Sequence, residues 1–293
     1  METARILVTG AAGHLGSHLA PALVREGYEV VALDMAEPEG QAPGVRFVRA
    51  SLNDDEAVRG TLERVDLICH AASIHPWKKY TDEQFLDANI KGTWNLYRTA
   101  AEVGVQRVEL TSSIAAIGYH NLPPGASPIR EDASFALGDL YSFTKHAQED
   151  TARLFAGQGK VRTIALRPPP FMPRGDLETG FSLLRPFAVV NDMVTAHVAA
   201  ARALLVDEAL ESFEAFFVTN RLPYTREDVV LARREGTLRP LVEKHWPGAW
   251  EWLSERGYDG AKGNTNVYDI SKARRLLGWE PAFNFEDWFA GRT

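Results

Sequence analysis

The chain has 293 residues, of which 45% are hydrophobic and 24% charged, so it can bury a large core in one domain or in a domain with a smaller lobe. Its net charge of −7 argues against nucleic acid as a partner. We find no apolar run long enough to span a membrane and no export signal, and the single cysteine, Cys69, cannot form a disulfide framework. These features predict a cytoplasmic protein without a membrane partner.

Short apolar runs alternate with helix-length segments over the first two-thirds of the chain. Strands are predicted at residues 5–9, 30–34, 45–50, 65–72, 107–113 and 161–168, and helices at residues 14–26, 82–103 and 140–156. Apolar strands that alternate with helices are typical of a parallel sheet covered on both faces. We therefore expect an α/β fold with a doubly wound (Rossmann) sheet, in which ligands bind at the carboxyl ends of the strands.

The last third has a mixed pattern. It contains a helix near residues 194–206, a strand in "FEAFFVTN" and a helical tail ending in "DISKARRLLGW", for which Ser271 is the expected N-cap. We predict that residues 1–168, with about 191–220, form the Rossmann domain. Residues 169–190 and 221–293 are expected to form a smaller lobe that binds the substrate.

A glycine-rich turn, "GAAGHLG", directly follows the first strand. Gly10, Gly13 and Gly16 allow a tight turn into a helix and let backbone N–H groups approach a pyrophosphate. Asp34 ends the second strand, where a carboxylate can accept hydrogen bonds from the ribose hydroxyls of an adenosine. No Lys or Arg lies between Asp34 and Val45 to neutralise a 2′-phosphate, so the predicted cofactor is NAD rather than NADP.

A tyrosine and a lysine four residues apart occur three times. The pairs are Tyr141 with Lys145 in "YSFTK", Tyr258 with Lys262 in "YDGAK", and Tyr268 with Lys272 in "YDISK". On a helix this spacing puts a phenol and an ammonium on one face. The spacing alone does not say which pair has a function.

The motifs taken together resemble those of the extended short-chain dehydrogenase/reductase family, also called the NAD-dependent epimerase/dehydratase family. The resemblance rests on "TGAAGHLG", "HAAS", "NIKGTWNL", "LTSS", "YSFTK" and "SKARRLLGW", which occur in the order found in the family. In the family the catalytic tyrosine begins the helix that follows the serine closing the fifth strand. Tyr141 stands at that place, and the other two tyrosines are expected to be structural.

The resemblance implies a catalytic role for Ser113, Tyr141 and Lys145, with Asn89 supporting the active-site helix and a proton path. A buried asparagine that only bonds to the backbone is the open alternative for Asn89. A free tyrosine has a pKa of about 10 and is a poor base at neutral pH, whereas a neighbouring ammonium favours the phenolate. Lys145 would supply that charge and bind the nicotinamide ribose. Ser113 would hold the substrate oxygen.

Further contacts follow from the resemblance. Ser73, His75, Ser113 and Arg174 are the expected substrate residues, Arg174 for a substrate carboxylate, although a surface role is open for His75 and Arg174. His70 is read as a core histidine rather than a ligand, although it is counted among the cofactor contacts, and Ser51 stands where relatives place an aspartate against the adenine. No set of residues has metal-ligand spacing. The expected cofactor contacts are Gly10, Ala12, Gly13, His14, Leu15, Gly16, Asp34, Met35, Ser51, Leu52, His70, Ala71, Ala72, Ser73, Asn89, Thr111, Tyr141, Lys145 and Pro168.

Two departures from the family pattern narrow the reaction. Ile114 and Ala115 replace the acidic residues that dehydratases and decarboxylases of this family carry after the fifth strand, so elimination is not expected. Pro170 replaces the asparagine of nucleotide-sugar epimerases, and the segment that follows is short, as in the uronate and sugar dehydrogenases. The leading hypothesis is an NAD-dependent oxidoreductase that acts on a hydroxyl of a small sugar-like or sugar-acid substrate. The alternatives are a nucleotide-sugar 4-epimerase and a non-catalytic NAD sensor or scaffold.

Relatives commonly dimerise through the helices that follow the fourth and fifth strands. Those helices correspond here to residues 82–103 and 140–156, so a homodimer is expected.

Overall fold

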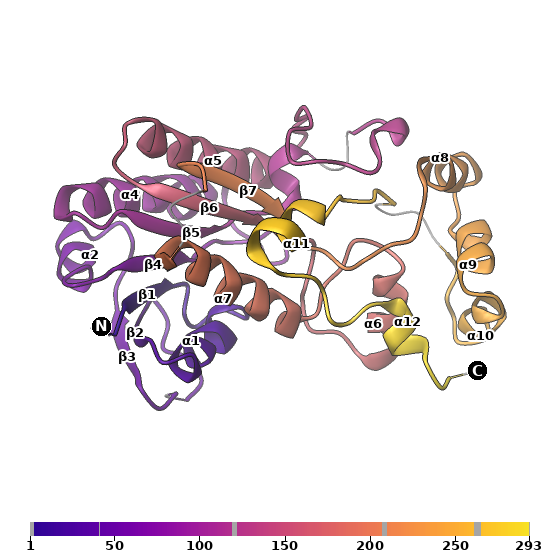
Figure 1. The fold of residues 1–293 in the computed structure, drawn as a ribbon, viewed down its shortest axis with the longest axis horizontal. Helices are drawn as coiled ribbons and strands as arrows, with labels where there is room; N and C mark the ends of the chain where they lie inside the picture. The colour runs from indigo at the N-terminus through magenta and orange to yellow at the C-terminus, as the bar shows by residue number, and fades with distance from the viewer. Residues whose placement is uncertain (1–2, 41, 119–121, 207–209, 261–264, 293) are drawn as a thin grey trace.

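The computed structural model describes residues 3–40, 42–118, 122–206, 210–260 and 265–292. Its centre is a parallel sheet of seven strands in the order β3-β2-β1-β4-β5-β6-β7. The predicted doubly wound α/β fold is confirmed (Figure 1). The strands are β1 (Arg5–Thr9), β2 (Glu29–Asp34), β3 (Val45–Arg49), β4 (Leu67–His70), β5 (Arg107–Thr111), β6 (Arg162–Arg167) and β7 (Phe213–Phe217).

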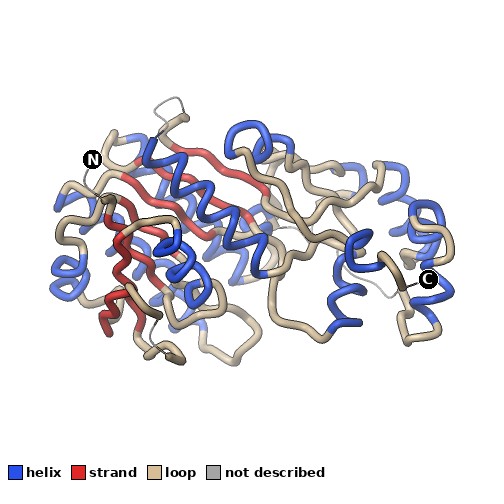
Figure 2. The backbone as a smooth tube through the Cα atoms, turned by 60° about the horizontal axis from the view of Figure 1, so that its bottom comes forward, coloured by secondary structure: helices blue, strands red, loops and turns tan. Residues whose placement is uncertain are grey.

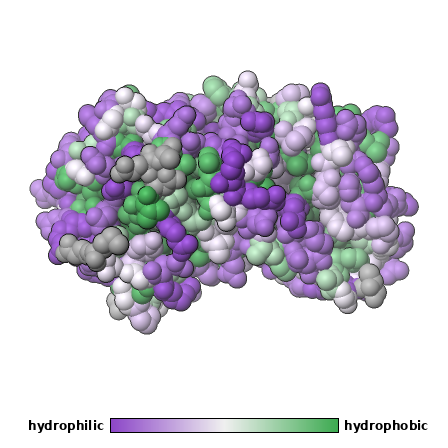
Figure 3. Space-filling model, in the orientation of Figure 1, coloured by the Kyte–Doolittle hydropathy of each residue, from purple (hydrophilic) through white to green (hydrophobic). Residues whose placement is uncertain are grey.

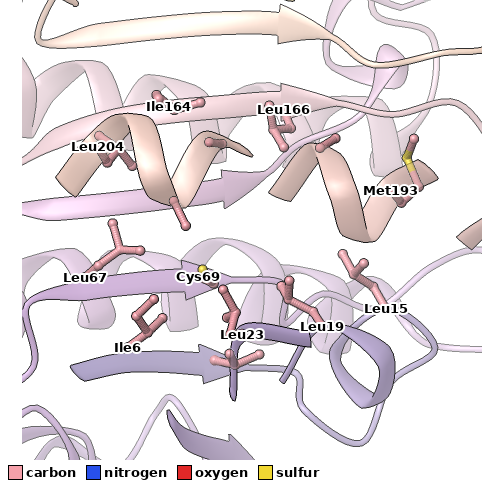
Figure 4. Close-up of a cluster of buried hydrophobic side chains, with 14 of the residues drawn as sticks. Ile6, Leu15, Leu19, Leu23, Leu67, Cys69, Ile164, Leu166, Met193 and Leu204 are labelled. Atoms are coloured by element: carbon pink, nitrogen blue, oxygen red, sulfur yellow. The ribbon is translucent and has the colours of Figure 1, made fainter. Parts of the chain in front are cut away.

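Helices cover both faces of this sheet. One face is packed by α1 (Gly16–Arg25) and α7 (Val190–Val206), and the other by α2 (Asp55–Thr61), α4 (Gly92–Val103) and α5 (Leu140–Gly157). Figure 4 shows the core under α1 and α7, where Leu19 and Leu23 face Ile6 and Cys69 of the sheet. These side chains are completely buried because the strands are apolar on both faces, as parallel strands between helix layers must be.

The direction of winding reverses between β1 and β4, the two central strands. Gly10 follows β1 with a φ of 70°, in the left-handed region that favours glycine, and a Cβ there would lie 2.6 Å from the Ala72 nitrogen after β4. A crevice at such a reversal is where open α/β sheets bind ligands. The turns after β1 and β4 therefore mark where a ligand site is expected.

Five of the remaining helices lie beyond the carboxyl end of the sheet, as Figures 1 and 2 show. They are α6 (Asp176–Leu183), α8 (Arg226–Glu235), α9 (Arg239–His245), α10 (Ala249–Ser254) and α12 (Phe285–Phe289), whereas α11 (Ser271–Leu277) packs against β7 and α7. A second, aromatic-rich core, with Tyr224, Phe285 and Trp288 among its buried members, holds several of the five together. The predicted domain boundaries stay a prediction. The helix and short helical turns not yet given are α3 (Asp82–Phe85), the π-helix η1 (Leu86–Lys91) and the 3-10 turns η2 (Ile114–Ile117) and η3 (Pro124–Ala126).

Two local expectations need correction. The predicted helix over residues 82–103 is not one α-helix, because η1 separates α3 from α4. Ser271 is the first residue of α11 rather than its N-cap, and its N–H donates to the Asp269 carboxylate at 2.9 Å. In each case a neighbouring side chain or an inserted residue decides the geometry, which helical periodicity does not encode.

None of the described helices combines the length and the apolar character that crossing a membrane requires. On the face drawn in Figure 3, hydrophilic residues predominate and apolar ones form small islands.

Candidate active site

A cavity of about 840 Å³ lies at the carboxyl ends of the central strands. The turn after β1, the loops after β4, β5 and β6, and the start of α5 all contribute to its wall. The predicted site residues that line it are Gly10, Gly13, His14, Leu15, Gly16, Asp34, Met35, Ser51, Leu52, Ala71, Ala72, Ser73, His75, Thr111, Ser113, Tyr141, Lys145 and Pro168. The fold thus brings most of the predicted residues to one place, although their individual roles stay predictions.

The glycine turn has the geometry of a phosphate cradle. A Cβ at Gly16 would lie 2.2 Å from the Gly10 carbonyl oxygen, so only glycine lets α1 start this close to β1. The N–H groups of His14 and Leu15 find no backbone or side-chain acceptor within the described ranges, and both residues line the cavity. Free N–H groups at the start of a helix favour an anion such as a pyrophosphate.

Asp34 ends β2 beside the glycine turn and lines the same cavity. Its two oxygens accept the N–H groups of Ala12 and Ala36, each at 3.0 Å, which fixes the carboxylate and leaves lone pairs on both oxygens. This fits the two hydroxyls of an adenosine ribose. Arg49, which lies outside the segment considered for a 2′-phosphate, reaches back to the Met35 carbonyl oxygen at 3.1 Å.

Lys145 is buried on α5, with 1% of its surface exposed. Its Nζ donates to the Thr111 carbonyl oxygen at 2.9 Å and lies 6.0 Å from the centre of the Tyr141 ring. Burial lowers the pKa of Lys145 from 10.5 to about 7, although Glu149 opposes the shift. A buried lysine with a shifted pKa, fixed by one acceptor and lining a cavity, is a candidate functional residue.

Tyr141 is the second residue of α5 and is half-buried at the cavity wall. Asp139 caps the helix by accepting the Ser142 N–H at 2.7 Å and the Ser142 hydroxyl at 2.9 Å. The cap fixes where the helix begins and so the direction of the phenol. The amino end of a helix also favours negative charge, which assists a phenolate in its first turn.

Ser113 caps the short turn η2 after β5. Its Oγ accepts the Ala115 N–H at 3.1 Å, so the hydroxyl proton remains available to a substrate oxygen. Ser112, the alternative serine, is occupied elsewhere, because its Oγ donates to Glu149 at 2.6 Å. This arrangement supports the choice of Ser113 over Ser112.

Asn89 lies in the π-helix η1 and is completely buried. Its amide donates to the Ile74 carbonyl oxygen and to the Thr144 hydroxyl, each at 3.1 Å, and its oxygen accepts the Ile74 N–H at 2.8 Å. Asn89 therefore ties the loop after β4 to α5, and both amide protons are used. It does not line the cavity among the described residues, and its predicted cofactor contact and proton path stay predictions.

His75 lies beside the phenol. The centres of the His75 and Tyr141 rings are 5.2 Å apart, and Trp77 lies 6.4 Å beyond the His75 ring. Burial, with the Lys145 charge as a second cause, lowers the pKa of His75 to about 3, so the imidazole is neutral at pH 7. His75 can thus offer a hydrogen bond or an aromatic face in the cavity, but not a positive charge.

Three further predicted residues lie outside the described lining. Ala12 contacts Asp34 through its N–H, as above. His70 is buried, and its two ring nitrogens lie 2.8 Å from the Thr9 hydroxyl and 2.9 Å from the Thr93 hydroxyl, which suits a core histidine. Arg174 is exposed, with its guanidinium 5.4 Å from the Phe187 ring centre, and its role toward a carboxylate stays a prediction.

The other two Tyr–Lys pairs do not reach this cavity through any described residue. Tyr268 is buried against Phe217 with ring centres 4.8 Å apart, while Lys272 binds the Ala215 carbonyl oxygen at 2.9 Å. Tyr258 is buried in the aromatic-rich core, and Lys262 lies outside the described residues. The position of "YSFTK" at the cavity distinguishes it from both.

Sequence reasoning missed much of the apolar wall. Ile74, Trp77, Ile114, Phe171 and Met172 line the cavity, with 54% of Trp77 and 38% of Met172 exposed. A weak signal was present, because these residues directly follow strands β4, β5 and β6, where ligands bind. The loop conformations that turn them inward are not encoded in a local pattern.

Comparison with known proteins connects this geometry to a family. The sequence profile of the NAD dependent epimerase/dehydratase family matches residues 6–181. A sterol-4-alpha-carboxylate 3-dehydrogenase (decarboxylating) of Bos taurus is 30% identical over 97% of this chain and 90% of its own length. A 3-beta-hydroxysteroid dehydrogenase of Mycolicibacterium neoaurum is 26% identical over 97% of this chain and 89% of its own length.

Solved structures agree with the fold. A uronate dehydrogenase from Agrobacterium tumefaciens superposes with a TM-score of 0.68 at 23% identity, over 98% of this chain and 87% of that one. This similarity, at low identity, confirms the architecture.

Proposed function

The chain belongs to the NAD-dependent epimerase/dehydratase family, and we propose that it oxidises a secondary hydroxyl of a small molecule with Ser113, Tyr141 and Lys145 as the catalytic residues. The expectations of a family member, an enzyme and an NAD cofactor are confirmed at this level. One observation carries the finer proposal. Lys145 is buried with its Nζ fixed on the Thr111 carbonyl oxygen, at the wall of the cavity that Ser113 and Tyr141 also line.

The residues present fit NAD, because the glycine turn offers free N–H groups and Asp34, beside the turn, offers two carboxylate oxygens. When bound, NAD supplies the hydride acceptor. The Ser113 hydroxyl donates to the substrate oxygen, and the Tyr141 oxygen takes the hydroxyl proton as the carbonyl forms. The Lys145 charge favours the phenolate that this step requires.

The lining of the cavity supports a proposal for the substrate class. Apolar side chains on the loops after β4, β5 and β6 line the cavity, with Ile74, Trp77, Ile114 and Met172 among them, and the hydroxyls of a free sugar packed against them would lose hydrogen bonds to water. Our first candidate substrate is therefore an alcohol with a largely apolar carbon skeleton. This agrees with the names of the sterol and steroid dehydrogenases that match along the chain.

A sugar acid is the second candidate. Lys78 lines the same cavity and offers a cation for a carboxylate. Arg174 is not among the described residues that line it. The nucleotide-sugar 4-epimerase stays a third alternative, because it would use the same three residues. The non-catalytic sensor is disfavoured by the buried, fixed Lys145 beside the phenol.

An absorbance assay at the NADH band tests these alternatives. NAD and a panel of hydroxysteroids, free sugar acids and nucleotide sugars are supplied, and net NADH formation is measured. Reduction with an apolar alcohol supports the first candidate and reduction with a sugar acid the second, whereas interconversion of nucleotide sugars without net NADH identifies an epimerase. Tyr141→Phe should abolish turnover while NAD still binds, and an unchanged rate would contradict the catalytic proposal.

The predicted homodimer also remains a proposal. The exposed apolar residues Trp94 on α4 and Phe143 and Leu154 on α5 lie on the helices that relatives use for dimerisation. Elution as a monomer at micromolar concentration, in sedimentation or light scattering, would contradict it.

A further inference from the structure

A row of buried contacts connects Lys145 to helix α7 on the opposite face of the sheet. The Lys145 Nζ donates to the Thr111 carbonyl oxygen at 2.9 Å, and the Thr111 Oγ1 lies 2.9 Å from the His197 Nε2. The His197 Nδ1 lies 2.7 Å from the Met193 carbonyl oxygen one turn earlier on α7. Each of these four residues is at most 8% exposed.

The direction of each hydrogen bond can be assigned. A carbonyl oxygen only accepts, so the His197 Nδ1 carries a proton. Burial lowers the pKa of His197 to about 4, so at pH 7 the imidazole is neutral and its Nε2 is an acceptor. The Thr111 hydroxyl must therefore donate to His197, which holds the last residue of β5 in one rotamer.

No charged partner competes for the imidazole among the described residues around it. The nearest acid, Glu109, has an oxygen 3.5 Å from the His197 Nε2, too far for a good hydrogen bond. Burial raises the pKa of Glu109 well above its ordinary value, so both groups are neutral and form no ion pair. Cys69, the third ionisable group in this cluster with His197 and Glu109, is also buried, and burial raises the pKa of its thiol.

Helix α7 is itself firmly anchored. Met193 and Leu204 pack into the core that Figure 4 shows, against Ile164 and Leu166 of β6. His197 lies between them in the chain and is completely buried. A side chain on such a helix has one position, which makes it a suitable fixed point for the end of β5.

We propose that His197 is a positioning residue for Lys145, because it fixes Thr111 and thereby the carbonyl oxygen that receives the lysine ammonium. The expected effect of His197 on turnover rests on the proposed function, but its effect on the position of Lys145 does not. The placement of the lysine can be measured without any substrate.

The direct measurement is the pH dependence of acetylation at Lys145. The protein is treated with acetic anhydride at a series of pH values, and mass spectrometry measures the acetylated fraction of this lysine. The titratable groups that face Lys145 are Tyr141 and Glu149 from α5, His70 at the end of β4 and His75 from the segment that follows, and all four are kept in every variant. His197→Leu and Thr111→Val each remove one side of the contact. His197→Gln keeps an acceptor near the Nε2 position. His245→Leu is the matched control, because it removes a histidine hydrogen bond elsewhere, the one between His245 and Asp228.

A carbonyl that accepts from the ammonium favours the charged lysine, so a loosened carbonyl lowers the pKa of Lys145 further. The labelling midpoint is expected to fall by about half a unit in His197→Leu and in Thr111→Val, and kcat by about tenfold. His197→Gln should restore most of both, and the double variant should match the single ones, because both act on one contact.

An unchanged labelling midpoint in Thr111→Val and His197→Leu, with a lower melting temperature alone, overturns the proposal and leaves His197 a packing residue. If His197→Leu does not fold, Thr111→Val tests the same contact at nearly constant volume. Full activity of Tyr141→Phe would overturn the proposed function instead, and the labelling result would still decide the role of His197.

Discussion

Two glutamates lie completely buried on opposite faces of the sheet, and the fold treats them in opposite ways. Glu149 on α5 binds Arg167 through two hydrogen bonds of 2.8 and 2.7 Å and accepts further ones from Ser112 and Arg153. Neither oxygen of Glu109 on β5 has a well-formed hydrogen bond among the described groups, although the Cys69 thiol lies near enough to oppose the effect of burial on its pKa. The pKa of Glu149 is lowered, with Arg167 as the main opponent of the burial cost, whereas burial raises the pKa of Glu109.

The difference shows what a buried carboxyl needs to stay ionised. Desolvation acts on both residues, but only Glu149 has a guanidinium and a hydroxyl arranged to offset it. Glu149 ties α5, the helix that carries Tyr141 and Lys145, to the end of β6. Glu109, with the buried His197 and Cys69 as its polar neighbours, has no such counter-charge and contributes no such tie.

The largest expected effect comes from breaking the satisfied pair. Glu149→Gln leaves the Arg167 guanidinium buried without its counter-charge, and we expect a loss of about 3 to 5 kcal/mol in the free energy of unfolding, measured by urea denaturation. Arg153→Gln is the control, because Arg153 is 38% exposed and its pair should be worth about 1 kcal/mol or less. Equal losses in the two variants would contradict the distinction.

The buried cation Lys145 extends the comparison to positive charge. Its pKa in the folded state, about 7, lies below the ordinary 10.5, so its contribution to stability is complete above pH 10.5 and is lost as the pH falls through about 7. Relative to Lys145→Met, the native chain should gain roughly 2 to 3 kcal/mol between pH 6 and pH 9. Parallel pH curves for the two proteins would show that the ammonium is well solvated.

The unsatisfied acid should give the opposite sign. Because burial raises the pKa of Glu109 above 4.5, its contribution is complete below pH 4.5 and is lost as the pH rises toward the folded value. Glu109→Met should therefore stabilise the protein by about 1 to 2 kcal/mol at pH 7, and by more at higher pH, in chemical denaturation. A loss of stability in this variant would reveal a partner for Glu109 that the described residues do not supply.

A third carboxylate, Asp34, sharpens the contrast because its free lone pairs face the cavity. Asp34→Ser removes the charge that repels a 2′-phosphate and leaves Arg49, which binds the Met35 carbonyl oxygen, close by. The ratio of kcat/KM with NAD to that with NADP should fall about tenfold, a change of about 1.4 kcal/mol. An unchanged ratio would place the preference for NAD elsewhere.

The sequence predicted those parts that depend on the chain order of motifs. Gly10, Asp34 and Tyr141 stand directly after a strand, at the end of one, or at the start of a helix, and the alternation of strands and helices brings such places to one edge of the sheet. The other Tyr–Lys pairs could be set aside by the same order. The strand pattern also located every strand to within a few residues.

The rest depends on tertiary contacts. Trp77 and Met172 line the cavity because of how two loops turn, and the saturation of Asn89 depends on where Ile74 and Thr144 come to lie. The glutamate in "RVELT" was a visible exception in an apolar strand. That His197 of α7 and Cys69 of β4 are its polar neighbours is known only from the fold.

Every described residue that lines the cavity precedes position 173, although the chain continues well beyond it. Among the described residues, the cavity wall is therefore built mainly from the turns that follow the strands and from the start of α5. An insertion or deletion in the later helices would change no residue of this wall.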